Sequence, residues 1–154
     1  MFLAGLLSGF ILIGVFLIYI FPRIMFSVNE SKYDFARTVE ALTESTKNNS
    51  WKMPHEYDLQ QIMTNNGFTV RPVKVFSICK PDIAVRILGN DKHRVVSAMM
   101  PCRIAVYEKA DGKAYISRIN PVLFARLLGG KAGAIMGDAG EGSEQIVKSV
   151  IKSS

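Results

Sequence analysis

The chain has 154 residues, of which 49% are hydrophobic and 21% charged, and its formal net charge is +6. A chain of this length has room for one compact core, and its hydrophobic content excludes a fully disordered protein. The basic residues are scattered, without a basic run or a recognisable nucleic-acid motif. We therefore expect one small domain and no nucleic-acid partner.

The first 22 residues, MFLAGLLSGFILIGVFLIYIFP, carry no charged side chain, and Arg23 is the first charged residue. An apolar run of this length can cross roughly 30 Å of hydrocarbon as a helix. A cleaved signal peptide would need a basic start and a small-x-small cleavage site, which are missing. The sequence predicts a transmembrane anchor over 1–22, a juxtamembrane linker over 23–33 and a single α+β domain over 34–154.

The residues in and after this predicted anchor bear on its orientation in the membrane and on its partners. Arg23, Lys32 and Arg37 follow it, which places the domain in the cytoplasm by the positive-inside rule, but interspersed acidic residues leave its side of the membrane open. Gly5 and Gly9 form a small-x-x-x-small pattern that lets another helix approach closely. The expected partners are membrane lipid and either a second copy of the chain, as a homodimer, or other membrane-protein subunits.

Hydrophobic spacing then predicts the first elements of the domain. Phe35 and Leu42 belong to an amphipathic helix of about four turns that ends at Asn48. A short extended piece over 51–54 precedes a short helix over 56–67, which closes on an Asn-Gly pair.

The next elements contain the first cysteine. A β-strand runs through Val73 and Val75 to Cys79, and Pro81 occupies the first turn of a helix that Gly89 stops. A loop over 90–97 follows.

The clearest local signal is a β-hairpin over about residues 102–118, where two alternating runs flank an Asp-Gly turn. A helix begins at Asn120, the glycine-rich residues 129–142 are expected to be mobile or tightly wound, and Ser143 caps a last helix. The predicted fold class is α+β, an antiparallel sheet with helices on one face, preceded by one N-terminal transmembrane helix.

Sulfur-containing residues are the main candidates for a site. Cys79 ends one predicted strand and Cys102 begins another, so both can lie at the same end of an antiparallel sheet, with Met99, Met100 and His55 in reach. Soft thiolate and thioether donors suit copper(I), and haem iron also accepts such ligands. No C-x-x-C or C-x-x-C-H spacing is present, so burial of these residues in the core is the competing interpretation.

Five stretches resemble, in their order, the bacterial and archaeal family called domain of unknown function 302: SKYDFARTVEAL, WKMPHEYDLQ, VKVFSICKPDIAVRIL, MMPCRIAVYEKADGKAYISRIN and LFARLLGG. The resemblance covers about residues 31–150. It implies a small α+β domain that tends to form dimers, often behind an N-terminal membrane segment, and no established catalytic activity. The expected location is a bacterial or archaeal cell membrane, crossed once.

The chain resembles a cysteine-bearing subgroup of that family. Its Cys-Lys-Pro element at 79–81 and Pro-Cys-Arg element at 101–103 match the two elements of the subgroup. Having both in one chain favours a shared sulfur site, with Lys80 and Arg103 in supporting roles.

We therefore expect a membrane-tethered, non-enzymatic binding or accessory module that holds copper, haem or sulfane sulfur at Cys79 and Cys102. The enzymatic alternative is thiol-disulfide or persulfide transfer, which needs a lowered pKa at Cys79, beside a helix N-terminus, or at Cys102, beside Arg103. A purely structural subunit of a membrane complex is the third interpretation, because the sequence has no complete catalytic constellation.

Overall fold

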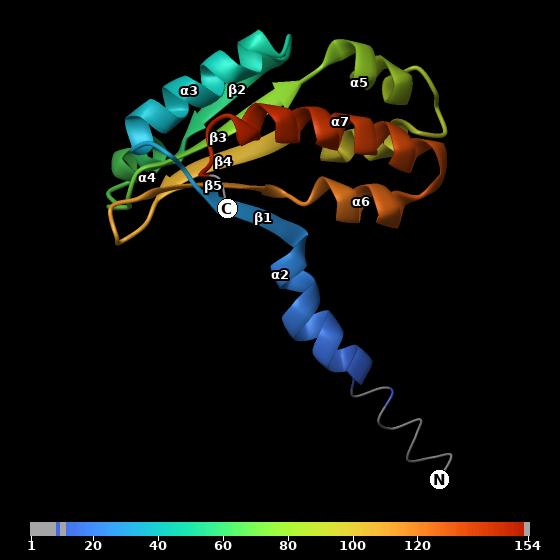
Figure 1. Ribbon diagram of the computed structural model, residues 1–154, viewed down its shortest axis with the longest axis horizontal. Helices are drawn as coiled ribbons and strands as arrows, with labels where there is room; N and C mark the ends of the chain where they lie inside the picture. Colours follow the sequence, from blue (N-terminus) through green and yellow to red (C-terminus); the bar gives the residue numbers. More distant parts are fainter. Residues whose placement is uncertain (1–8, 10–11, 153–154) are drawn as a thin grey trace.

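An antiparallel sheet of five strands forms the frame of the computed structural model, which describes Gly9 and residues 12–152 (Figure 1). The strand order is β1-β5-β4-β3-β2. The strands are β1 (Phe26–Glu30), β2 (Lys52–Asp58), β3 (Val73–Cys79), β4 (Cys102–Glu108) and β5 (Ala114–Ile119). The helices of the domain are α3 (Phe35–Asn48), α4 (Leu59–Asn65), α5 (Pro81–Leu88), the 3-10 helix η2 (Arg94–Met99), α6 (Pro121–Leu128) and α7 (Gly130–Lys148). The predicted α+β class with an antiparallel sheet is confirmed.

The core lies between the sheet and the helices α3 and α7, which run side by side over one face (Figure 1). Alternation along the strands turns Phe76, Ile104 and Ile116 toward these helices, and each of the three is fully buried. Burial of one such side chain stabilises the fold by about 1.5–3 kcal/mol. In the register of this sheet Ile78 pairs with Cys102, so the second cysteine lies at the margin of the core.

The glycine-rich residues, which we predict to be mobile or tightly wound, belong to the long helix α7. The helix runs without interruption through that segment, and Ser143 lies inside it rather than at its start. The physical reason is close packing: a Cβ at Gly140 would overlap Pro121 of α6, and a Cβ at Gly142 would lie 2.6 Å from the ring of Trp51. The glycines therefore let α7 approach its neighbours closely.

Three other elements differ from the prediction. β1 lies within the segment predicted as a linker, and it completes the sheet by pairing Phe26 with Ile119. β2 extends through Tyr57, which we had assigned to a helix, and η2 occupies part of the predicted loop. In each case a distant strand or helix supplies the contacts, which local hydrophobic spacing does not reveal.

The N-terminal and C-terminal segments of the domain meet at the edge strand β1. Ser31 forms an isolated β-bridge with Ile151, and the backbone N–H of Lys152 donates to the Glu30 carbonyl at 3.0 Å. The side chain of Val150 is almost completely buried beside this bridge. The last described residues are therefore part of the fold.

The predicted transmembrane helix is wrong. Within Gly9 and 12–152, no helix has both the length and the apolar character that crossing a bilayer requires. The described residues ahead of β1 include the π-helix η1 (Phe16–Ile20) and α2 (Phe21–Met25). The expected single-pass location in a cell membrane is corrected with it.

The predicted glycine packing face and partners of this segment are not tested by the described residues. Residues 1–8, 10 and 11 of the predicted anchor, Gly5 among them, lie outside the described residues. At Gly9 an added Cβ would meet no atom within 4 Å. The glycine packing face and the expected homodimer or other subunit partner stay predictions.

Candidate functional site

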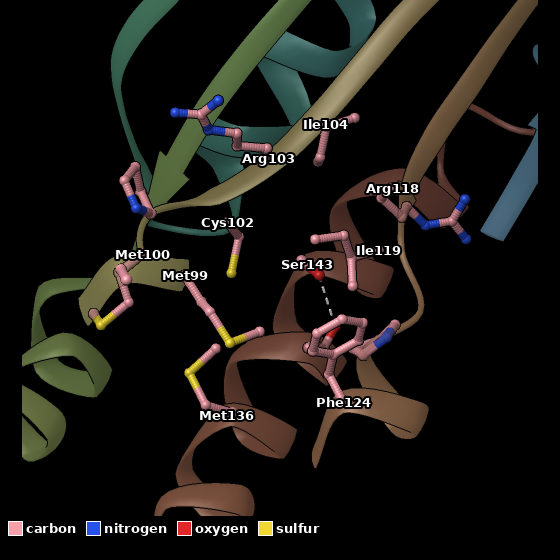
Figure 2. A pocket seen from close by; sticks show the side chains of 14 residues that line it. Met99, Met100, Cys102, Arg103, Ile104, Arg118, Ile119, Phe124, Met136 and Ser143 are labelled. Carbon is pink, nitrogen blue, oxygen red and sulfur yellow. Dashed lines mark hydrogen bonds between the residues drawn. The ribbon is translucent and has the colours of Figure 1, made fainter. Parts of the chain in front are cut away.

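A cavity of about 470 Å³ lies where β4 begins, between the end of the sheet and the helices α6 and α7 (Figure 2). Its walls come from four parts of the chain: the segment from η2 into β4, the end of β5, and the facing sides of α6 and α7. Most of the side chains that face it are apolar, including Ile104, Ile119, Phe124 and Met136. The size and the apolar lining are typical of a small-ligand site.

Three sulfur-containing side chains point into this cavity. Met99 ends η2, Cys102 begins β4, and Met136 lies in the middle of α7. Figure 2 shows the Cys102 thiol and the thioethers of Met99 and Met136 directed toward the same space, and all three residues line the cavity. The fold therefore gathers one thiol and two thioethers from three separate elements.

The local sequence explains how each donor is held. Cys102 alternates with Ile104 and Val106 on the buried face of the central strand, so its side chain faces the helices. Met136 and Gly140 are four residues apart on α7 and lie on the same side of that helix, where both line the cavity. The Ser143 hydroxyl on this side donates to the Gly140 carbonyl at 2.8 Å, so it is already satisfied (Figure 2).

Cys79 lies beside this cavity rather than in it. It lines a much smaller neighbouring space of about 20 Å³ together with Cys102, Lys80 and Met100. Both cysteines are free thiols. The expected proximity of the two cysteines is thus present, but only Cys102 reaches the larger cavity.

The surroundings of both thiols favour the protonated form. Burial raises the pKa of Cys102, and the nearby Cys79 raises this pKa further. Burial also raises the pKa of Cys79. This direction is opposite to the lowering that thiol-disulfide or persulfide transfer needs.

The one buried ion pair at the cavity wall is directed away from the sulfur atoms. The side chain of Arg118 is only 7% exposed, and its guanidinium donates through Nε to Glu144 Oε1 at 2.6 Å and through Nη1 to Asn29 Oδ1 at 2.8 Å. Figure 2 shows this head group turned out of the cavity. The charge of Arg118 is therefore neutralised by Glu144, and the interior of the cavity is left apolar.

Of three other residues expected at the site, His55 lies elsewhere, whereas Arg103 and Met100 lie at the edge of the cavity. His55 is exposed on β2, where its ring centroid is 6.1 Å from that of Tyr57, and it lines neither cavity. The exposed guanidinium of Arg103 lies over the same tyrosine, 5.8 Å from the ring centroid, although its backbone borders the larger cavity. Met100 borders both cavities and packs against Ile87 and Val96.

Met136 was not predicted as a site residue, because the glycine-rich segment was predicted to be mobile or tightly wound rather than part of a long helix. A helical signal was present in the spacing of Ile135, Ala139 and Ile146, all of which are buried in α7. Phe124 was missed as a site residue although its helix was predicted. Only the packing of α6 on α7 brings this ring to the cavity.

Ordinary metal-site residues do not gather in the described part of the chain. No group of three or more His, Cys, Asp and Glu side chains there is arranged to hold a metal ion. Any metal at Cys102 would therefore depend on the thioethers.

Comparisons with known proteins give a family and a fold. Residues 27–152 match the family model described as "Domain of unknown function DUF302". A crystal structure of an uncharacterized conserved protein DUF302 from Bacillus stearothermophilus is similar with a TM-score of 0.72 and 19% sequence identity, over 81% of this chain and 97% of that chain. At this identity the likeness shows the fold alone. No curated protein matches the chain.

Proposed function

Because this chain belongs to the DUF302 family, whose description names no activity, we propose its function from the cavity: a non-enzymatic binding module that holds a soft ligand through Cys102. The single observation that carries the proposal is the meeting of one thiol and two thioethers in one apolar cavity. Sulfur donors of this kind prefer soft centres such as copper(I) or haem iron. The two cysteine-bearing elements also support placing the chain in a cysteine-containing subgroup of the family.

Two features favour binding over chemical turnover. The raised pKa of each cysteine leaves little thiolate at neutral pH, and a nucleophilic cysteine needs the thiolate. Among the described residues, the lining of the larger cavity includes no histidine and no carboxylate that would take up the thiol proton. A cavity with a protonated thiol and no proton acceptor suits a ligand that stays bound, whereas a sulfur-transfer reaction would need a thiolate.

The test is the ligand content of the full chain, purified from cells without chelators and under anaerobic conditions. We expect elemental analysis, haem absorbance or native mass spectrometry to detect a soft metal, haem or bound sulfane sulfur. Cys102→Ser should lose this ligand. Cys79→Ser is the matched control and should keep it, because Cys79 does not line the larger cavity.

Two results would contradict the proposal. One is a wild-type chain that carries none of these ligands and takes up none of them when they are added. The other is loss of the ligand from Cys79→Ser with full retention in Cys102→Ser, which would move the site out of the larger cavity.

A further inference from the structure

We propose that the ligand of the cavity is a single copper(I) ion, coordinated by Sγ of Cys102 and by the Sδ atoms of Met99 and Met136. This inference rests on the proposed function above and names its ligand and its donors. The three residues line one cavity, and their sulfur atoms are directed toward a common space (Figure 2).

The donor set selects among metals. Soft thiolate and thioether ligands suit copper(I), whereas zinc(II) and iron(II) sites draw on imidazole or carboxylate groups or on more thiolates. The described residues that line the larger cavity offer neither imidazole nor carboxylate, and they include only one cysteine. Methionine has a flexible side chain, so Met99 and Met136 can draw in around an ion that is much smaller than the cavity.

Charge balance leads to the same ion. One thiolate and one copper(I) ion together carry no net charge, and thioethers are neutral, so the complex is compatible with the apolar wall of Ile104, Ile119 and Phe124. A divalent ion on the same donors would leave a positive charge in this apolar space, which is costly without a counter-ion. The partly exposed carboxylate of Glu144 is already paired with Arg118.

The binding step is a ligand exchange without oxidation or reduction. The S–H bond of Cys102 breaks, a sulfur–copper bond forms, and the proton leaves to solvent while copper remains copper(I). Met99 and Met136 each donate a lone pair and release nothing. A central strand and a long helix fix the backbone positions of Cys102 and Met136, and the flexible methionine side chains then adjust to the ion.

The experiment is an anaerobic titration of the reduced full chain with copper(I) in competition with a coloured copper(I) chelator. We expect one ion per chain, and X-ray absorption spectra of the complex with sulfur neighbours and no nitrogen. Cys102→Ser should abolish this binding. Met99→Leu and Met136→Leu should each weaken it by about tenfold or more, which is the loss of roughly 1.4 kcal/mol of binding free energy.

The matched control is Met53→Leu. It removes a thioether from β2, but Met53 lines neither cavity, so copper(I) affinity should stay that of the wild type. Exchange of methionine for leucine nearly conserves volume, and circular dichroism of each variant checks that it folds. If a variant does not fold, the X-ray absorption spectrum of the wild type still decides the donor atoms.

The outcomes separate this inference from the proposed function. One outcome is copper(I) binding that needs Cys102 but is unchanged in both Met99→Leu and Met136→Leu. This result would overturn the proposed donors, while the proposed function as a binding module would stand. Binding of haem or sulfane sulfur at Cys102, with no copper(I) uptake, would overturn the choice of ion alone. Absence of every soft ligand at Cys102 would overturn both.

Discussion

At the scale of single residues, the two thiols differ from a free cysteine because the fold favours their protonated forms. Burial raises the pKa of Cys79, and both burial and Cys79 raise the pKa of Cys102. In ligand-free, reduced protein near neutral pH, we predict that iodoacetamide alkylates both thiols more slowly than it alkylates the urea-unfolded chain. The alkylation rates of the folded chain should rise with pH. They should approach the rates of the unfolded chain only well above about pH 8.5, which is the ordinary pKa of cysteine.

Mass spectrometry of peptides that contain each cysteine measures the two rates separately. A folded thiol that reacts faster than the unfolded one near pH 7 would contradict the raised pKa and would revive thiol transfer as a function.

A second residue-scale prediction concerns the ion pair of Arg118 and Glu144. The arginine is only 7% exposed, so Glu144→Gln leaves a buried positive charge without its counter-ion. We expect a loss of about 3 kcal/mol in the free energy of unfolding, measured with urea. The control is Glu40→Gln, which breaks the exposed pair of Arg37 and Glu40 and should cost less than about 1 kcal/mol. Equal losses in the two variants would show that burial does not set the strength of the first pair.

At the scale of elements, α7 depends on glycines that packing requires at some positions and not at others. A Cβ at Gly140 would overlap Pro121 of α6, so Gly140→Ala should push the two helices apart and destabilise the fold by about 1–3 kcal/mol. Gly137 is the matched control in the same helix, because its added Cβ would meet Ala125 at an ordinary 3.6 Å. Gly137→Ala should stabilise the fold by up to about 1 kcal/mol through helix propensity.

Thermal unfolding of the two variants measures these opposite shifts. Stabilisation by Gly140→Ala would mean that α6 and α7 do not pack as closely as the structure has them.

The same helix illustrates which elements the sequence could predict. The hairpin of β4 and β5 was predictable because its signal is local: alternating side chains around the turn at Gly112, whose backbone φ is positive. α7 was not predictable in this way, because its glycines lower local helix propensity and are explained only by Pro121 and Trp51, which lie far away in the sequence. Likewise, β1 is a strand because β5 pairs with it, and its five residues carry no distinct signal of their own.

At the scale of the whole molecule, some site residues could be placed from local sequence signals, and others only from contacts between distant segments. The sequence placed Cys79 and Cys102 at one end of the sheet from strand boundaries alone, and they do line a common small space. It could not place Met136, which meets Met99 and Cys102 only after α7 has packed across the sheet. His55 was an error of the opposite kind: it was expected in reach of the two cysteines, but it lies exposed on β2 and lines neither cavity.

The bridge between Ser31 and Ile151 has a consequence for biosynthesis. β1 leaves the ribosome long before its partner β5 exists, and the bridge between Ser31 and Ile151 closes only after Ile151 has emerged. Pairings of such large sequence separation form late in folding. A nascent chain must therefore keep the backbone of β1 as an unpaired strand until β5 has been made. Because Met136 comes from α7, which follows every strand of the sheet in the chain, the cavity is completed only after α7 has packed, and its ligand binds after that step.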